Sequence, residues 1–267
     1  MQINSSSTSV SSYNQSLTNS QKAAQQIAAG KKINSAADNP AVLAIISGMQ
    51  GQIGGSDQAY RNTQDSISLL NTADGAAANS SDVIQSMRTL SVQAANGTLT
   101  DSDRSIIQQQ MNQYSAQLDS IAQNAQFNTI NTSDGTLGNF VTQVGANGGQ
   151  TAAMTIGNIS AAALGMNVDV STQASASSSI EAADSALQEV STLQGNIGAV
   201  TNGLQASSSN VSQSSTNLKA AASSLRDSDI ASQATLFNQS NIQSYVSMML
   251  LTKQMQNQHQ GTISLLA

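Results

Sequence analysis

Apolar residues recur at intervals of seven through the C-terminal half of this 267-residue chain. The series consists of Val190, Ile197, Leu204, Val211, Leu218 and Leu225. Such spacing keeps one side of a helix apolar along its whole length, as in helices that wind around partner helices. A helix over residues 176–225 would be roughly 75 Å long at ~1.5 Å per residue. Because its glycines weaken it, this helix needs other helices to pack against.

A second position of the same helix is filled by small residues, Ser207, Ser214 and Ala221. They predict that a neighbouring helix approaches closely on this side. The first half of the chain supplies such neighbours, because its apolar residues alternate at steps of three and four. The first of these two further seams contains Ile46, Met49, Ile53, Tyr60, Ile67 and Leu70, and the second contains Ile107, Met111, Tyr114, Leu118 and Ile121.

Local signals predict where these helices begin and end. Pro40 suits the first turn of a helix, where its missing N–H does no harm. A break is expected at Asn96-Gly97-Thr98, and Thr100 with Asp103 resembles a capping box with Asp in place of Glu. Three long seamed helices predict a mainly α fold, an elongated antiparallel coiled-coil bundle.

Residues 127–170 lack helical periodicity and are rich in Gly, Asn and Thr. Residues 140–144 and 151–156 flank the Gly-rich segment 145–149, which predicts two short strands joined by a turn. One hairpin is marginal alone, so it should pack on the bundle.

The two ends of the chain are amphipathic as well. Ile3, Val10 and Leu17 are seven residues apart, and Phe237, Met249 and Leu250 belong to a broader apolar stripe near the C-terminus. Residues 1–20 are so rich in Ser and Asn that a helix there should be marginal by itself. We therefore expect both ends to become ordered only by packing with other segments.

Composition and charge exclude several classes of function. The net charge of −6 disfavours nucleic acid and an anionic membrane surface as partners, and no apolar run approaches the ~20 residues of a membrane span. With no cysteine and one histidine, His259, we expect no metal site and no cofactor. The Gly-rich segment lacks the ending of a phosphate-binding loop. No catalytic constellation is visible, so an enzyme is not expected.

Several segments resemble the signature motifs of bacterial flagellins. At the N-terminal side these are residues 30–41 (GKKINSAADNPA), 61–70 (RNTQDSISLL) and 90–98 (LSVQAANGT). Residues 126–129 (QFNT) and the hairpin at 144–147 fit the same family. Residues 225–231 (LRDSDIA) and the closing segment with Leu265 and Leu266 resemble its C-terminal signature.

The resemblance implies a subunit that assembles with copies of itself into a flagellar filament for swimming. Residues 1–42 and 226–267 would form the inner tube, with helices that pair in the filament. Residues 43–175 and 176–225 would form the outer tube, and the variable outer domains are expected to be absent. The family is exported by a flagellar type III apparatus without a cleaved signal peptide, so we expect the protein outside the cell. Implied partners are an export chaperone, the filament cap and the hook-junction proteins.

Flagellins of several groups are also sensed by a vertebrate Toll-like receptor, through a face before the Asn-Gly-Thr break. Arg88, Leu90 and Gln93 match that face. Ser86 stands where the family usually has arginine, and Gln110 where it usually has glutamate. The resemblance therefore implies weakened receptor activation.

Two other functions are compatible with the helical pattern. A hook–filament junction protein shares the terminal motifs, and a secreted coiled-coil effector or adhesin would engage a host partner through its helices. Copy number separates them from a filament subunit, which is made in thousands.

Overall fold

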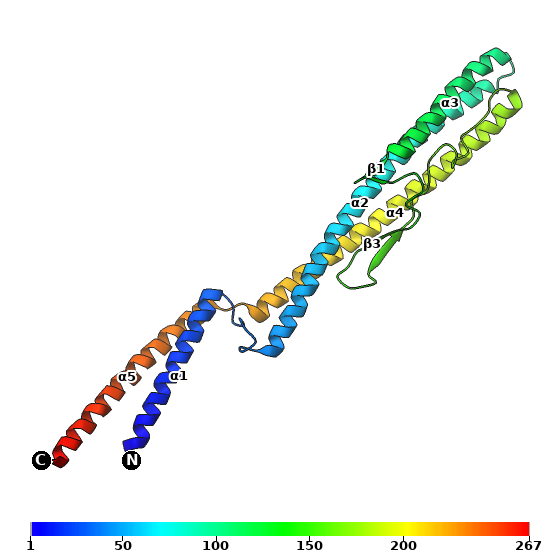
Figure 1. Ribbon diagram of the computed structural model, residues 1–267. Helices are drawn as coiled ribbons and strands as arrows, with labels where there is room; N and C mark the ends of the chain where they lie inside the picture. Colours follow the sequence, from blue (N-terminus) through cyan, green and yellow to red (C-terminus); the bar gives the residue numbers. More distant parts are fainter. Residues whose placement is uncertain (1, 267) are drawn as a thin grey trace. The chain divides into compact units, whose positions relative to one another are not determined.

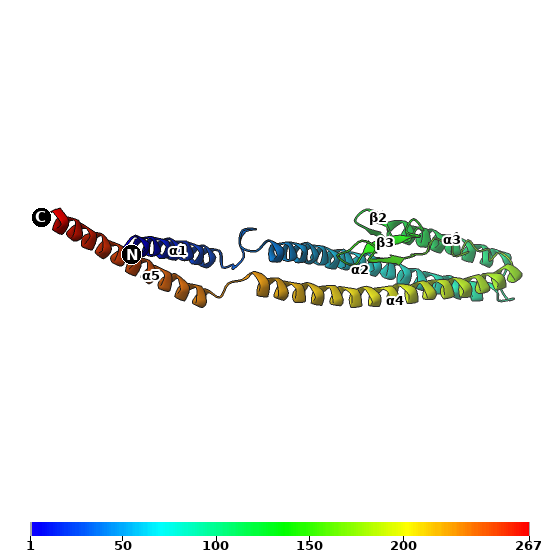
Figure 2. The same cartoon turned by 90° about the horizontal axis from the view of Figure 1, so that it is seen from below.

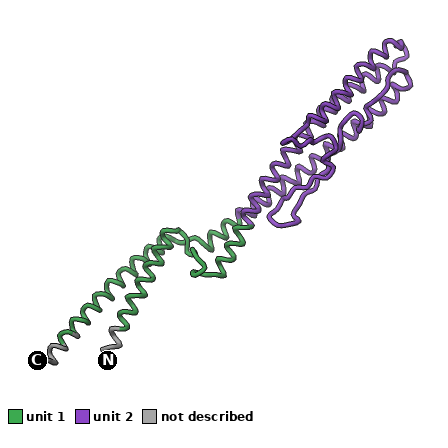
Figure 3. The backbone as a smooth tube through the Cα atoms, viewed as in Figure 1, with its two compact units in different colours: residues 1–51, 217–267 green, residues 52–216 purple. Residues whose placement is uncertain are grey.

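The computed structural model describes the backbone of residues 2–266 and the side chains of residues 7–257, 259 and 260. Its elements are α1 (Gln2–Ala29), α2 (Pro40–Ala94), α3 (Asp101–Asn124), β1 (Gln126–Phe127), β2 (Ile130–Asn131), β3 (Phe140–Gln143), β4 (Thr151–Met154), α4 (Gln173–Arg226) and α5 (Ile230–Leu266) (Figure 1). The predicted mainly α fold is confirmed. The chain divides into two compact units, residues 1–51 with 217–267 (unit 1) and residues 52–216 (unit 2) (Figure 3).

Unit 2 is a helix bundle in which α2, α3 and α4 run side by side (Figures 1 and 2). Hydrogen bonds join α2 to α4: Gln64 donates to the Ser208 hydroxyl at 3.1 Å, and Ser215 donates to the Asp57 carboxylate at 2.7 Å. The short α2–α3 connection makes these two helices antiparallel neighbours.

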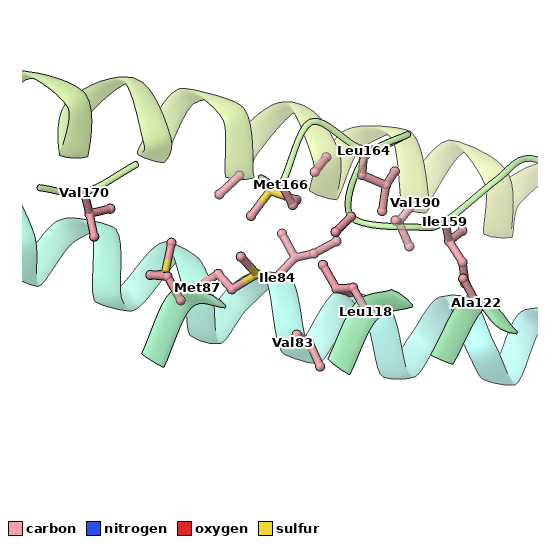
Figure 4. Close-up of a cluster of buried hydrophobic side chains, with 14 of the residues drawn as sticks. Val83, Ile84, Met87, Leu118, Ala122, Ile159, Leu164, Met166, Val170 and Val190 are labelled. Atoms are coloured by element: carbon pink, nitrogen blue, oxygen red, sulfur yellow. The ribbon is translucent and has the colours of Figure 1, made fainter. Parts of the chain in front are cut away.

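The main core of unit 2 lies between the three helices and the segment 159–170 (Figure 4). Its fully buried side chains include Ile84 and Met87 of α2, Leu118 of α3, Val190 of α4, and Met166 of the segment. Residues 161–165 of this segment form turns, and its Ile159 and Val170 are also buried.

A second core cluster covers the part of α2 and α4 that α3 does not reach. Leu70 and Leu204 pack there with Met154 and Ile156, and the half-buried Phe140 closes the cluster. The predicted hairpin is the antiparallel pair β3–β4. The same region holds a second hairpin, β1–β2, which the sequence did not reveal because strands of two residues leave no alternation to detect.

Capping residues fix both ends of the α2–α3 connection. Thr100 and Asp103 form the predicted capping box, with each side chain accepting from the other residue's backbone N–H. Arg104 is buried and donates to the carbonyls of Ala94 and Asn96 at 3.0 and 3.3 Å. A cation at the C-terminal end of α2 is favourable because the helix dipole is negative there.

The buried stripe of α4 departs from the predicted heptad. Val190, Ile197 and Leu204 are buried, whereas Val211, Leu218 and Leu225 are only half-buried. The prediction that the small residues Ser207, Ser214 and Ala221 face a neighbouring helix is wrong by one position. The next residue is buried in each case, namely Ser208, Ser215 and Ala222. Ser179, Ile197 and Ser215 follow at 18-residue steps, as do Ala186, Leu204 and Ala222. Eighteen residues are about five turns at 3.6 residues per turn, so the stripe follows the period of a straight helix.

Candidate assembly surface

Small residues, most of them serines, are buried in the contact between α1 and α5, the terminal pair of unit 1. Ser16, Ser20 and Ala23 are buried on α1, and Ser240 is buried on α5. The Ser20 hydroxyl donates to Asn241 Oδ1 at 2.7 Å across the pair. Small side chains let the two helices approach closely, but they bury little apolar surface and so stabilise the pair weakly.

Most large apolar residues of α5 remain exposed although α1 packs against this helix; Phe237 and Leu251 are half-buried. Among the described side chains, the exposed ones are Ile230, Leu236, Ile242, Tyr245, Val246, Met248, Met249, Leu250 and Met255. Tyr245 and Met249 are each 72% exposed. On α1, Val10 is 43% and Leu17 is 39% exposed. We call this set the outward stripe. The pair thus buries mainly small residues and leaves most of its large apolar side chains exposed, and such an exposed apolar surface is typical of a site of protein–protein contact.

A groove of about 550 Å³ runs along one side of the terminal pair. Ser12, Gln15 and Asn19 of α1 line one wall, and Ile242 and Val246 of α5 line the other. The groove has polar groups on one wall, which can form hydrogen bonds, and apolar groups on the other wall, which gain from burial. It could therefore receive a side of another amphipathic helix.

Backbone hydrogen bonds join the segment that follows α1 to the segment that precedes α5. Lys32 N–H donates to the Arg226 carbonyl at 2.7 Å, and Ser228 N–H donates to the Gly30 carbonyl at 3.1 Å. Gly30 ends α1 with a φ of +65°, the left-handed conformation that favours glycine. Lys32 Nζ also donates to the Ser224 carbonyl at 3.0 Å. The segments that follow α1 and precede α5 are thus held against each other.

Carboxylates stabilise these same segments. Backbone N–H groups of Asn34 and Ser35 donate to Asp38 at 3.0 Å and, with the cation of Lys22 at 3.7 Å, they lower the pKa of Asp38. Hydrogen bonds from Ser223 and Arg226 lower the pKa of Asp227. Both carboxylates therefore remain charged at neutral pH.

The predicted seam residues fall into four groups. Ile46, Ile67, Ile107, Val190, Ile197 and Leu204 are buried, and Ile53, Tyr114, Ile121, Val211, Leu218, Leu225 and Phe237 are half-buried. Val10, Leu17, Tyr60, Met249 and Leu250 are exposed. Ile3, Leu265 and Leu266 lie outside the described side chains. Tyr60 does not fill the seam predicted for it, because Ala59 and Thr63 of α2 take the buried positions.

The residues predicted for receptor contact lie on α2 and α3 of unit 2. Arg88 is engaged within the chain, because its Nε donates to Asp184 of α4 at 2.6 Å. This contact raises the pKa of Arg88 and lowers the pKa of Asp184. Leu90 is half-buried against the main core, whereas Gln93 and Gln110 are exposed.

The described part of the chain contains no group of three His, Asp or Glu residues that could hold a metal ion. His259 is exposed on α5. Among the described helices, none is long and apolar enough to cross a membrane.

Comparison with known proteins identifies the family. The profile of the bacterial flagellin N-terminal helical region matches residues 2–137, and the profile of the C-terminal helical region matches residues 180–266. The chain belongs to the bacterial flagellin family. It is a structural subunit of the flagellar filament, a polymer that lies outside the cell and serves motility.

Individual flagellins extend this likeness to nearly the whole chain. A flagellin of Halalkalibacterium halodurans is 34% identical over 253 residues, which cover 94% of this chain and 93% of the relative. The flagellar filament core protein flaB2 of Brachyspira hyodysenteriae is 31% identical and covers 90% of both chains. The crystal structure of Bacillus cereus flagellin is 30% identical, has a TM-score of 0.50, and covers 61% of this chain and 94% of that one.

Sequence reasoning missed the orientation of the terminal pair. The apolar repeat of α1 and α5 predicts an apolar stripe on each helix but not which face turns toward the other helix. A signal was present, because Ser16, Ser20 and Ala23 also follow at steps of four and three. Small residues at such steps permit close helix contact, as at small-residue interfaces in other helix pairs.

Proposed function

We propose that the terminal pair is the polymerising part of this flagellin, and that its outward stripe and groove are filled by terminal pairs of neighbouring copies. Residues 1–42 and 226–267 then form the inner tube of the filament, and residues 43–175 and 176–225 form the outer tube. The observation that carries this proposal is the reversed polarity of the pair, with Ser16, Ser20 and Ser240 inside and Met249 outside.

The energetics favour ordering of the pair in the polymer. Full burial of a large apolar side chain contributes about 1.5–3 kcal/mol, whereas ordering one backbone residue costs about 1–2 kcal/mol. The serine contact within one chain gains little against this entropy. Contacts with several copies would bury the outward stripe, and a contact repeated from copy to copy builds an open helix.

Further partners follow from the same proposal. An export chaperone would cover the outward stripe before assembly, and the filament cap and hook-junction proteins would meet it at the two ends of the polymer. We also propose export by the flagellar type III apparatus and a purely structural, non-enzymatic role.

The test of the polymer is electron microscopy of the purified protein at high concentration and of cells that lack it. We expect filaments in the first sample and a loss of filaments in the second. Failure to polymerise under any condition, together with intact filaments on the deletion strain, would exclude the proposal.

Weak activation of the Toll-like receptor is a separate proposal. Ser86 and Gln110 lack the charges usual in the family, and Arg88 is paired with Asp184. In a cell reporter assay we expect Ser86→Arg with Gln110→Glu to raise activation above that of the natural chain. If the natural chain already matches a strong flagellin agonist, the proposal is wrong.

A further inference from the structure

Asparagine is followed by glycine at three places in the chain, Asn96-Gly97, Asn147-Gly148 and Asn202-Gly203. In such a pair the glycine nitrogen can attack the asparagine carboxamide, because glycine has no side chain to shield that nitrogen and its backbone turns freely. All three asparagines are exposed. Because the dipeptide is the same at each place, its surroundings in the fold decide which asparagine reacts.

Two of the three pairs lie in surroundings that do not promote this attack. Asn202 lies inside α4, where a regular helix holds each peptide N–H on the carbonyl four residues earlier. Asn147 lies in the β3–β4 turn, where its carbonyl accepts from the Gln143 carboxamide at 2.6 Å and from the Gln150 N–H at 3.3 Å. Both of these donors are neutral.

The third pair, in the connection between α2 and α3, has a carboxamide that is already positioned for attack. The Thr98 N–H donates to Asn96 Oδ1 at 3.1 Å. This hydrogen bond folds the carboxamide over the Gly97 peptide group, so the electrophilic carbon and the nucleophilic nitrogen belong to one tight turn. The same N–H stabilises the negative charge that develops on Oδ1 when the nitrogen attacks.

A buried cation acts on the nucleophile of this pair. Arg104 is 7% exposed, and its Nη1 donates to the Asn96 carbonyl at 3.3 Å. That carbonyl and the Gly97 nitrogen form one peptide group, so the cation stabilises the negative charge that the group gains when the nitrogen loses its proton. Within the described part of the chain, the buried Nε of Arg104 has no hydrogen-bond partner. The guanidinium can therefore bind additional negative charge.

We propose that Asn96 is a site of self-deamidation, activated by the Thr98 N–H and the Arg104 guanidinium. The Gly97 nitrogen forms a bond to Cγ of Asn96, and the bond between Cγ and Nδ2 breaks. The proton of the Gly97 nitrogen leaves with the amino group as ammonia, and a cyclic imide remains. Water then adds to one of the two imide carbonyls and opens the ring to a carboxylate.

The position of Arg104 also determines the product. Its guanidinium polarises the carbonyl that belonged to the Asn96 main chain, so water should add at that carbon. The main chain then continues through the side-chain carbon of residue 96 as isoaspartate, and the new carboxylate forms beside Arg104. A charge-assisted hydrogen bond to the guanidinium favours this product. The inference does not depend on the polymer, because all of these groups belong to unit 2.

Mass spectrometry of peptides from aged protein tests the site. The full-length chain would be kept in mildly alkaline buffer, below the concentration that forms filaments, with and without urea that unfolds it. Asn147 is a matched internal control, because alanine precedes both it and Asn96. In the folded chain Asn96 should deamidate about 5- to 15-fold faster than Asn147, since a hydrogen bond to a charged group exceeds a neutral one by about this factor.

In urea the two asparagines should react at similar rates, and Asn96 should react more slowly than it does in the folded chain. Fragmentation that distinguishes isoaspartate from aspartate should show isoaspartate as the main product at Asn96. An Asn96 rate in the folded chain that does not exceed the rate in urea, or does not exceed that of Asn147, would overturn the proposal.

Arg104→Gln tests activation by the cation. It should lower the Asn96 rate by about 5- to 15-fold and leave the Asn147 rate unchanged. Even if this variant loosens the connection, the Asn96 rate should fall to that of the unfolded chain, which is also below the natural rate. The control Arg61→Gln removes an exposed arginine that bonds to Gln58 of its own helix, and it should change neither rate. An unchanged Asn96 rate in Arg104→Gln would refute the role of Arg104.

Gly97→Ala tests the cyclic route. A Cβ at this position would lie 3.7 Å from the nearest atom of Gln173, an ordinary contact distance, so the fold should be kept. The same Cβ would shield the attacking nitrogen, so the Asn96 rate should fall several-fold. An unchanged rate would show that water hydrolyses the carboxamide directly and would overturn the proposed reaction.

Discussion

Replacing two residues of the outward stripe by serine should weaken polymerisation without unfolding the bundle. Ile242 and Met249 lie seven residues apart on α5 and are 63% and 72% exposed. Full burial of either side chain contributes about 1.5–3 kcal/mol, so burying their exposed parts contributes about 2–4 kcal/mol in total. Because about 1.4 kcal/mol corresponds to a factor of ten, Ile242→Ser with Met249→Ser should raise the critical concentration about 30- to 700-fold.

Sedimentation of filaments over a range of protein concentrations measures this critical concentration. The matched control is Gln239→Ser with Gln256→Ser, two exposed polar residues on the same helix. The control variant makes a similar small change in helix propensity, so it should shift the critical concentration by less than about threefold. Circular dichroism should show the unfolding transition of unit 2 unchanged in both variants. If both pairs of substitutions shift the critical concentration equally, burial of the outward stripe is not the driving force.

Three further predictions concern unit 2. Gly54→Ala should stabilise α2 by up to about 1 kcal/mol, because nothing lies within 4 Å of the added Cβ. A Cβ at Gly55, in contrast, would lie 3.0 Å from the Cβ of Ala146. The melting temperature of Gly55→Ala should therefore be lower than that of Gly54→Ala, and the opposite order would refute the close contact. Leu118→Ala removes a fully buried side chain and should lower the free energy of unfolding by about 2–5 kcal/mol in urea titrations; a loss below about 1 kcal/mol would show that this core is loosely packed. The pKa of Asp103 is lowered from its ordinary value of 3.8 by hydrogen bonds from Thr100, so its stabilisation is complete above that value and is lost as pH falls through the lower pKa of the folded state. Asp103→Asn should therefore be less stable than the natural chain at pH 7 but equally stable in strong acid, and a deficit that is independent of pH would contradict the capping role.

Short-range patterns in the sequence predicted the local features of the fold. The capping box needs only Thr100 and Asp103, three residues apart, so it is visible without knowledge of the rest of the molecule. The β3–β4 hairpin is likewise predicted by its glycine-rich turn. Burial of Ile197 and Leu204 follows from the apolar repeat of α4 itself.

Features that depend on the neighbouring helix could not be predicted in the same way. Whether position 207 or 208 of α4 is buried depends on how tightly the helices wind around each other, which the heptad spacing alone does not determine. The positive φ values of Asn128 and Thr129 are imposed by strand pairing and not by glycine. Burial of Arg104 depends on the C-terminal carbonyls of α2 coming to lie next to α3.

The orientation of the terminal pair is the most consequential of these features. Its apolar repeat predicts helices that need partners, but it does not tell whether the partners are within the same chain or in other copies. Within the chain, Ser20 and Asn241 meet across the pair while Tyr245 and Met249 remain exposed, which supports the proposal that their partners are in other copies. The assembly role of the outward stripe rests on this arrangement.

Filament formation by chains that lack residues 1–30 or residues 235–267 tests most directly whether the terminal pair drives assembly. Each truncated protein would be concentrated, sedimented and viewed by electron microscopy, and its helix content would be followed during thermal unfolding. We expect a soluble protein that retains the cooperative unfolding of unit 2 and forms no filaments. Truncated protein that polymerises at the concentration needed by the full chain would contradict the claim that the terminal pair drives assembly.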